Sequence, residues 1–285
     1  MTDYRDLSAG LAARMALEKY GFRFSHSLGQ NFILDDGLVR RIVEAAGVRA
    51  GERVLEIGPG AGVMTRCLAE AGARVVAVEL DRSLEPVLDA VLAGFDVRLV
   101  FEDILKLDLD ALMGEEPFSV VANLPYYITA DVVLRLLTGA RRPERIVIMV
   151  QKEAAERMMA RPDTKTWCAL AATAQYFGRI EPLMELPPSA FTPLPHVESV
   201  LLGIHLYEEK PFAARDEALL LKVIAAAFAM RRKTLANNLT AAFSVNRETA
   251  LSWIAALGRD GRVRGEVLGI EELCALSDII GEARG

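Results

Sequence analysis

The stretch Arg53 to Gly62, RVLEIGPGAG, decides the fold of this 285-residue chain. Residues 53–57 are short, mostly apolar and β-branched, which is typical of a buried strand, and the Gly-Pro-Gly that follows predicts a tight turn. Residues 63–71 then have helical character, and Gly72 ends that run. The stretch therefore predicts a strand that passes through a glycine-rich turn into a helix.

The same alternation continues along the chain. Apolar segments with strand character recur at residues 74–81, 97–104, 119–127 and 145–153. Helical runs such as residues 131–137 lie between them. Apolar strands that alternate with helices predict a parallel α/β sheet covered on both faces. Residues 179–186 and 200–207 are expected to add an antiparallel, hairpin-like edge around the proline-rich segment 187–195.

After Pro211 the pattern becomes helical. Four segments with helical period are separated by polar or glycine-containing loops, at residues 218–230, 234–243, 248–257 and 270–280. The sequence thus predicts an α/β, Rossmann-like sheet domain with a small C-terminal all-helical domain. We place the boundaries at 1–22 for an N-terminal arm or short helix, 23–208 for the sheet domain and 209–285 for the helical domain.

The composition is that of an ordinary globular protein, with 52% apolar and 25% charged residues. No run approaches the ~20 apolar residues of a membrane span, and residues 1–10 lack the features of a secretory signal. Cys67, Cys168 and Cys274 are isolated and odd in number, which favours a reduced, cytoplasmic protein. The three histidines show no ligand spacing, so no metal site is expected.

The net charge of −6 averages over a segregated sequence. Residues 50–134 hold 15 acids against 6 bases, a balance of −9, whereas residues 222–247 hold 5 bases and no acid. Residues 135–165 hold 8 bases against 4 acids. Because local fields steer polyanions, the basic segments keep a nucleic-acid partner possible, although ordinary solvated helix faces would show the same charges.

Functional-looking groups follow four successive predicted strands: the glycines of residues 58–62, then Glu79, Asp103 and Asn123. Ligands of open parallel sheets lie outside the carboxyl ends of the strands. The glycines allow a ligand to approach the backbone closely, and Glu79, which lies 21 positions after Gly58, is placed to accept both hydroxyls of a ribose. A nucleotide site is therefore predicted, against the alternative of a tight turn with three capping acids.

The glycine loop distinguishes between nucleotides. Val63 occupies the place of the third glycine in a dinucleotide fingerprint, which weakens an NAD assignment without removing it. The run from Glu56 to Gly62 instead resembles the E-x-G-x-G-x-G loop of S-adenosylmethionine-dependent methyltransferases. That resemblance implies that the glycines, Gly58 and Gly60 among them, pack against the amino-acid part of the cofactor and that Asp103 meets its adenine amine.

The run Asn123-Leu124-Pro125-Tyr126 resembles the signature of methyltransferases that modify exocyclic amines. The N6 amine of adenine is a poor nucleophile because its lone pair is delocalised. The Asn123 side-chain oxygen and the Leu124 carbonyl can accept its two N–H hydrogens, and Pro125 fixes the carbonyl direction. Tyr126 can stack on a purine that has left its helix, so positioning supplies most of the catalysis. A proline turn with aromatic packing is the plainer alternative.

From about residue 24 to 280 the chain resembles the ribosomal RNA adenine dimethyltransferase family, in the branch that modifies two adjacent adenosines near the 3′ end of small-subunit RNA. The segment SLGQNFILD resembles the family's N-terminal cofactor motif, which implies contacts from Gln30, Asn31 and the Ile33 backbone. The segment PPSAFTPLPHVESVLL implies that Phe191 closes over the adenine opposite Tyr126. His26, Ala236 and the pair Trp167-Cys168 depart from the family pattern.

The segment FAMRRKTLANNL resembles the arginine-rich start of the family's C-terminal domain, so Arg231, Arg232 and Lys233 are expected to bind RNA. The resemblance implies an enzyme that acts on the small ribosomal subunit. Nothing in the sequence suggests an obligate dimer, so a monomer is expected. An enzyme of the large-subunit, antibiotic-resistance branch, a ribosome-assembly factor with little catalysis and an NAD oxidoreductase remain the alternatives.

Overall fold

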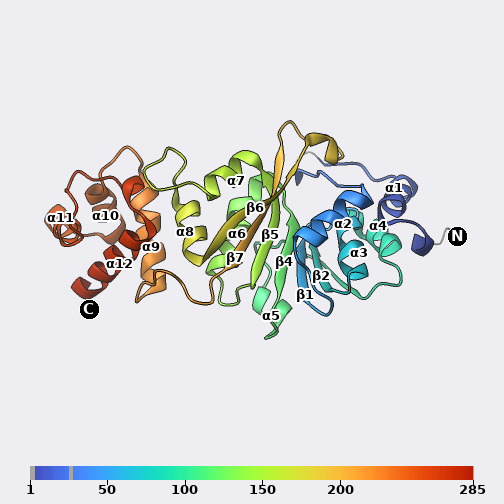
Figure 1. Cartoon of the computed structure of the whole chain (residues 1–285), viewed down its shortest axis with the longest axis horizontal. Helices are drawn as coiled ribbons and strands as arrows, with labels where there is room; N and C mark the ends of the chain where they lie inside the picture. The colour runs from blue at the N-terminus through green and yellow to red at the C-terminus, as the bar shows by residue number, and fades with distance from the viewer. Residues whose placement is uncertain (1–3, 26–27, 285) are drawn as a thin grey trace. The chain divides into compact units, whose positions relative to one another are not determined.

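The structure is a computed structural model that describes residues 4–25 and 28–284, so His26 and Ser27 lie outside the described residues. The chain divides into two compact units, which we describe separately: residues 1–155 with 181–206, and residues 156–180 with 207–285 (Figure 1). The first unit holds the sheet and the second is helical.

The first unit is built on one seven-stranded sheet with the order β3-β2-β1-β4-β5-β7-β6. Strands β1 to β5 pair in parallel, and β7 pairs with β5 in antiparallel fashion. The α/β prediction is therefore confirmed. The strands are β1 (Arg53–Ile57), β2 (Arg74–Glu79), β3 (Val97–Phe101), β4 (Ser119–Asn123), β5 (Arg145–Gln151), β6 (Gly178–Leu186) and β7 (Ser199–Leu206).

The strand order reverses at β1, which lies between β2 and β4. Ile57, the last residue of β1, aligns with Val78 of β2 and with Ala122 of β4. The residues that follow these positions, Gly58, Glu79 and Asn123, are thus brought to one edge of the sheet. A reversal of this kind leaves a crevice at the carboxyl ends of the two central strands, where ligands of such sheets bind.

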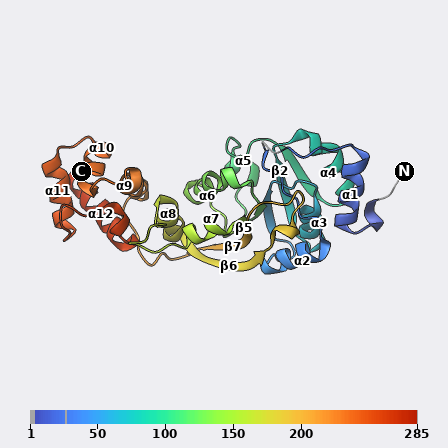
Figure 2. The same cartoon turned by 90° about the horizontal axis from the view of Figure 1, so that it is seen from above.

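The sheet is buried on both faces, as predicted. Val54, Val75 and Val121 point to one face and join a single apolar core with buried residues of the first four helices. Leu55 and Val120 alternate with them, point to the opposite face and are fully buried as well. The helices of this unit are α1 (Ala9–Lys19), α2 (Asp36–Ala45), α3 (Val63–Glu70), α4 (Glu85–Val91), α5 (Leu109–Met113), α6 (Thr129–Thr138) and the start of α7 (Lys152–Met158) (Figures 1 and 2).

Residues 4–22, predicted as an arm or a short helix, form an integral part of the first unit. Helix α1 buries its alanines in the sheet domain's core, and Ser8 caps its N-terminus by accepting from the Leu11 N–H. Arg66, 4% exposed on α3, donates to the main-chain carbonyls of Tyr4, Arg5 and Leu7. The guanidinium also pairs with Glu70 at 2.9 Å. It fixes the segment because its remaining buried N–H groups would lose their acceptors if those carbonyls moved.

The second unit contains α8 (Ala169–Phe177), α9 (Glu217–Ala229), α10 (Leu235–Phe243), α11 (Arg247–Ala256) and α12 (Ile270–Arg284). Its division from the sheet lies at residues 206/207, close to the predicted 208/209, but residues 156–180 join it too. Trp167 explains this: its indole is fully buried and donates to the Leu268 carbonyl at 3.0 Å. Trp167 therefore has a structural role within this unit.

Asn238 of the ANNL segment also serves the fold. Its side chain is 1% exposed, and its amide nitrogen donates to the Ala227 carbonyl at 3.1 Å and reaches the Met230 carbonyl at 3.5 Å. These carbonyls lie at the C-terminal end of α9, where a helix leaves its last acceptors unpaired. Asn238 thus fixes the turn that carries the basic segment at residues 231–233.

Within residues 4–25 and 28–284, no helix is long and apolar enough to cross a membrane. Over the same residues, no group of three or more acidic, histidine or cysteine side chains is placed to hold a metal ion. Cys67, Cys168 and Cys274 are all free thiols.

Candidate active site

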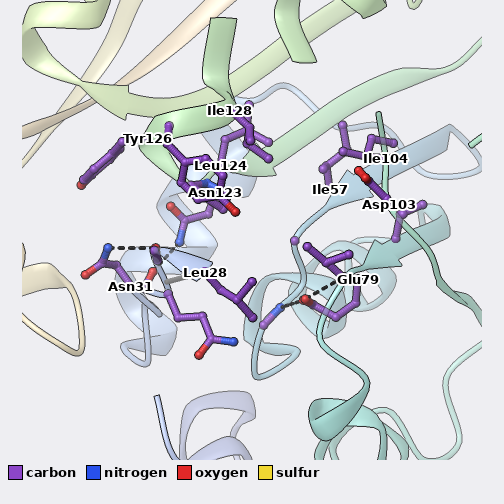
Figure 3. Close-up of a pocket in the computed structure, with 18 of the residues that line it drawn as sticks. Leu28, Asn31, Ile57, Glu79, Asp103, Ile104, Asn123, Leu124, Tyr126 and Ile128 are labelled. Carbon is purple, nitrogen blue, oxygen red and sulfur yellow. Dashed lines mark hydrogen bonds between the residues drawn. The ribbon is translucent and has the colours of Figure 1, made fainter. Parts of the chain in front are cut away.

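The carboxyl ends of β1 to β4 open onto a cavity of about 250 Å³ in the first unit. Figure 3 shows Asn31, Asn123 and Tyr126 at one end of it, and Glu79 and Asp103 at the other. Ten of the residues predicted as site residues line this cavity: Gln30, Asn31, Gly58, Gly60, Glu79, Asp103, Asn123, Leu124, Pro125 and Tyr126.

The glycine loop takes backbone conformations that favour glycine. Gly58 and Gly60 have φ values of +74° and +56°. A Cβ atom on Gly60 would lie 2.8 Å from the Phe32 ring, whereas one on Gly58 would meet the Asn123 carbonyl at 3.5 Å. Gly60 therefore serves the packing of Phe32 against the loop, while Gly58 keeps the floor of the cavity open at the end of β1.

Glu79 ends β2 with a carboxylate that is 8% exposed. One oxygen accepts from the Gly60 N–H at 3.1 Å, and the other accepts from the N–H groups of Leu80 and Asp81 at 2.9 Å each. Burial nevertheless raises the pKa of this carboxyl above its usual value. Because a carboxylate offers about four acceptor positions, three bonds to the protein leave room for a ligand hydroxyl on the Gly60 side.

Asp103 follows β3 and marks the far end of the cavity. One oxygen accepts from the Leu105 N–H at 3.0 Å, and the other lies 3.4 Å from the Lys106 ammonium. The apolar side chains of Ile57 and Ile104 lie beside it in the cavity wall (Figure 3). A carboxylate next to apolar surface suits a flat heterocycle that carries an amine, because the ring is buried and the amine hydrogen finds an acceptor.

Gln30 lines the cavity, but both ends of its side-chain amide are engaged by the protein. Its nitrogen donates to Asp81 at 2.7 Å, and its oxygen accepts from the Ser25 N–H at 2.7 Å. Gln30 therefore links the N-terminal motif to the end of β2. Its amide holds the loop in place, and the predicted direct contact with a cofactor stays a prediction.

Asn123 and Asn31 meet at the end of β4. The Asn123 amide nitrogen donates to the Asn31 main-chain carbonyl at 2.7 Å, and the Asn31 side chain in turn donates to the Gly29 carbonyl at 3.1 Å. Because a carbonyl can only accept, this contact determines which end of the Asn123 amide is the nitrogen. Its oxygen is thereby left available as an acceptor for a ligand.

Tyr126 is held by a residue from a distant strand. Its hydroxyl lies 2.9 Å from that of Ser199, the first residue of β7, which is 1% exposed. The preceding Pro125 carbonyl accepts from the Ile128 N–H at 3.2 Å and the Thr129 hydroxyl at 3.3 Å. The Asn123–Tyr126 run is thus a fixed turn that presents a ring and an amide to one cavity, and Leu124 anchors it with a side chain that is 2% exposed.

The side chains of Phe191 and Ile33, two further predicted site residues, do not line the main cavity. Phe191 is 3% exposed and belongs to the apolar core, outside the lining of the main cavity. Its neighbour Thr192 exchanges two main-chain hydrogen bonds of 2.8 Å with Phe32, so the late motif is bound to the N-terminal motif. Ile33 lines a small neighbouring cavity together with Glu56. The structure therefore shows both residues in packing positions.

Glu56, the acid of the glycine-loop motif, is fully buried. Within the described part of the chain, neither of its oxygens meets the geometry of a full hydrogen bond. Burial raises the pKa of Glu56 to about 8, Glu79 adds to the shift, and the nearby Thr65 hydroxyl opposes it. At neutral pH this side chain is therefore mostly an uncharged acid beneath the loop.

The predicted RNA-binding residues lie together in the second unit, after α9. Arg231 donates to the Lys165 carbonyl at 2.7 Å and lies 3.4 Å from Glu266. Arg232 and Lys233 are exposed, and among the described residues neither takes part in an ion pair. The structure therefore separates one arginine that holds a loop from two cations that face solvent.

Three contributors escaped the sequence analysis: Ser199 as the partner of Tyr126, Phe32 as the residue packed on Gly60, and the Asn31 carbonyl as the partner of Asn123. All three lie in segments that the sequence had singled out as motifs. Their roles depend on contacts between distant parts of the chain, which local patterns do not report.

Comparisons with known proteins agree with this geometry. Residues 21–266 match the family model described as ribosomal RNA adenine dimethylase. The chain is 40% identical to the ribosomal RNA small subunit methyltransferase A of Geobacillus kaustophilus, over 97% of this chain and 98% of that protein. It is 38% identical to the protein of the same name from Clostridioides difficile, over 96% of each chain.

Two solved structures share the fold. A dimethyladenosine transferase from Plasmodium falciparum superposes with a TM-score of 0.70 at 23% identity, over 85% of this chain and 94% of that one. The 23S rRNA methyltransferase ErmE superposes with a TM-score of 0.64 at 25% identity, over 88% of this chain and 100% of that one.

Proposed function

This chain belongs to the ribosomal RNA adenine dimethylase family, and on that premise we propose that it transfers methyl groups from S-adenosylmethionine to the N6 amines of two adjacent adenosines near the 3′ end of small-subunit rRNA. The observation that carries the proposal is the orientation of Asn123 beside Tyr126 in one cavity. An acceptor oxygen next to an aromatic ring is what an unstacked adenine requires.

The residues present fit S-adenosylmethionine as the methyl donor. Glu79 has an acceptor position left for a ribose hydroxyl, and Asp103 with Ile104 suits the adenine end. Gly58 leaves space at the end of β1 for the amino-acid part. When bound there, the cofactor would supply an electrophilic methyl group directed toward Asn123.

The chain's own part in the reaction is to hold the amine. The Asn123 oxygen and the Leu124 carbonyl would accept the two N6 hydrogens, which favours lone-pair density on the nitrogen. Tyr126 would stack on the purine, and its bond to Ser199 limits how far that ring can move. No group is needed to remove a proton before transfer, because the N6 proton would be lost to water after the new N–C bond forms and S-adenosylhomocysteine is left. The rate therefore depends on positioning. Phe191 is proposed to close over the base from the late motif, which requires its ring to leave the apolar core in which it is packed.

Recognition of the RNA is proposed to run through the C-terminal helical domain, residues 209–285, with Arg232 and Lys233 as contacts to phosphates and Arg231 as a contributor. The partner would be the small ribosomal subunit, met by a monomer in the cytoplasm. The free, separated thiols suit a reducing compartment.

The small-subunit branch is favoured over the large-subunit branch. The chain is 40% and 38% identical, over nearly its whole length, to two proteins that are both named as small-subunit methyltransferases. The experiment is to incubate the protein with labelled S-adenosylmethionine and either unmethylated small subunits or unmethylated large subunits. Incorporation into the small subunit alone is expected, and incorporation into the large subunit alone would overturn the assignment.

A further inference from the structure

Tyr127 has no part in the reaction described above. It follows Tyr126 directly, lines the same cavity and is 59% exposed. A large aromatic side chain in a cavity wall that keeps more than half of its surface open to solvent lies at the rim of that cavity. Tyrosine is enriched at interfaces because its ring is apolar while its hydroxyl can stay in water.

The surroundings of Tyr127 fix one edge of its ring. A Cβ atom on Gly29 would lie 3.5 Å from Cε1 and 3.6 Å from Cδ1 of Tyr127, and 3.4 Å from Cβ of Pro125. Gly29 itself has a φ of +61°, which favours glycine. The ring therefore leans with one edge on the Gly29 loop, while its exposure shows that most of the remaining surface faces outward.

The two consecutive tyrosines are thus used differently. The hydroxyl of Tyr126 is tied to the buried Ser199, whereas Tyr127 rests on Gly29 at the rim. When one base enters the cavity, the next base of the strand is left outside it, within reach of the rim. Aromatic rings bind unstacked bases face to face, largely without regard to sequence, because every base has a π face.

We infer that Tyr127 is a stacking platform for the nucleobase next to the target adenosine. The platform holds the strand while the target is in the cavity, and because two adjacent adenosines are modified, each in turn is the other's neighbour. This inference rests on the proposed function. Tyr127 is a positioning residue, since it touches the neighbouring base and none of the reacting atoms.

The test is a double-mutant cycle, in which the Tyr127 ring and the neighbouring base are removed singly and together. Small subunits are reconstituted with rRNA whose 3′ segment is synthetic, and the nucleotide next to one target adenosine is natural, changed to uridine, or abasic. Methyl transfer to the remaining adenosine is measured for the wild type, Tyr127→Ala and Tyr127→Phe. Tyr20→Ala, at an exposed tyrosine after α1, is the matched control.

A stacked base contributes roughly 5- to 150-fold in affinity. The abasic substrate should therefore raise the wild-type KM by such a factor, while uridine should change it by less than about threefold. Tyr127→Ala should show the same rise on natural RNA and no further rise on abasic RNA. Tyr127→Phe should keep the wild-type value, and S-adenosylmethionine affinity should be unchanged in all variants.

Two results would overturn the inference. The first is a Tyr127→Ala enzyme with the wild-type KM. The second is a KM for Tyr127→Ala on abasic RNA that rises by the product of the two separate effects. Reduced S-adenosylmethionine affinity in Tyr127→Ala would place the ring on the cofactor instead. If the wild type methylates no adenosine of the natural substrate, the proposed function fails, and that outcome is distinct from the other three.

Discussion

The side-chain amide of Asn123 donates a 2.7 Å hydrogen bond to the main-chain carbonyl of Asn31, 92 positions earlier in the chain. This bond joins the two motifs that line one end of the cavity and turns the Asn123 oxygen away from the Asn31 carbonyl. It thereby sets the acceptor that the proposed reaction uses.

Asn123→Asp is the sharpest test of that bond. A carboxylate cannot donate to the Asn31 carbonyl, so it would be repelled from its position, and the turnover number should fall by roughly 100-fold or more, as for other removed positioning groups. Asn246→Asp is the matched control, because Asn246 is exposed and its aspartate keeps the oxygen that caps α11. Steady-state methyl transfer on small subunits measures both, and wild-type turnover in Asn123→Asp would refute the role.

Tyr126 should separate catalysis from cofactor binding. Tyr126→Ala is expected to keep S-adenosylmethionine affinity within about threefold and to lose most methyl transfer, because base stacking is worth roughly 1–3 kcal/mol. Tyr126→Phe keeps the ring and loses only the bond to Ser199, so its loss should be smaller, and Ser199→Ala should match it. Wild-type turnover in Tyr126→Ala would mean that the ring only packs.

Glu79→Ala should weaken S-adenosylmethionine binding about tenfold or more, because a lost hydrogen bond to a charged group costs roughly 1.5–3 kcal/mol. Titration calorimetry measures the affinity. Glu102→Ala is the control, since Glu102 is an exposed carboxylate in the same cavity wall. Equal affinities for wild type and a folded Glu79→Ala protein would remove Glu79 from the cofactor site.

The raised pKa of Glu56 predicts how the free energy of unfolding depends on pH. Its ordinary pKa of 4.5 applies to the unfolded chain, and the folded value is about 8. Between these values the folded protein holds a proton that the unfolded chain has lost. The contribution of Glu56 to the free energy of unfolding is therefore complete below pH 4.5 and falls as pH rises toward 8, by at most about 1.4 kcal/mol per pH unit.

Glu56→Gln should flatten that slope, so the difference in melting temperature between variant and wild type should shift in the variant's favour from pH 5 to pH 8. Thermal unfolding at both pH values measures it, with the exposed Glu44→Gln as control. Parallel pH profiles for the Glu56→Gln protein and the wild type would show that Glu56 does not hold the proton.

The basic segment should divide between two roles. Replacing Arg232 and Lys233 with glutamine should weaken small-subunit binding and flatten the slope of log affinity against log salt by about two units, because each phosphate contact contributes about one. Arg231→Gln should lower the melting temperature, since it loses its bond to the Lys165 carbonyl. A double variant with an unaltered salt slope would exclude these two residues from the RNA contact.

The sheet was largely predictable from the sequence because strands that are buried on both faces consist of nearly continuous apolar residues. The 53–57 strand matches β1 residue for residue, and residues 200–207 lie within one position of β7. Helix α2 was not predicted, although Leu38, Val39 and Ile42, which are all buried, have helical spacing. The order of β6 and β7 was not predicted, although Glu181 and Pro182 in β6 are typical of an edge strand and the apolar run of β7 is typical of an interior strand.

The position of a cavity residue was predictable where it follows the end of a predicted strand, as for Glu79 and Asp103. It was not predictable where the role is a contact between distant segments. Ser199 is 73 positions from Tyr126, and the Gln30 amide is occupied by Asp81. Neither pairing has a local sequence signal, because the sequence around a polar residue does not show which distant residue it will bond.

The most direct test of the central claim is to map the modified bases. Unmethylated small subunits are incubated with S-adenosylmethionine and either wild type or Asn123→Asp, and the rRNA is digested and sequenced by mass spectrometry. We predict N6-dimethyladenosine at two adjacent positions near the 3′ end with the wild type, and unmodified adenosines at both with the variant. Methyl groups at any other position, or none at all with wild type that binds S-adenosylmethionine, would contradict the account.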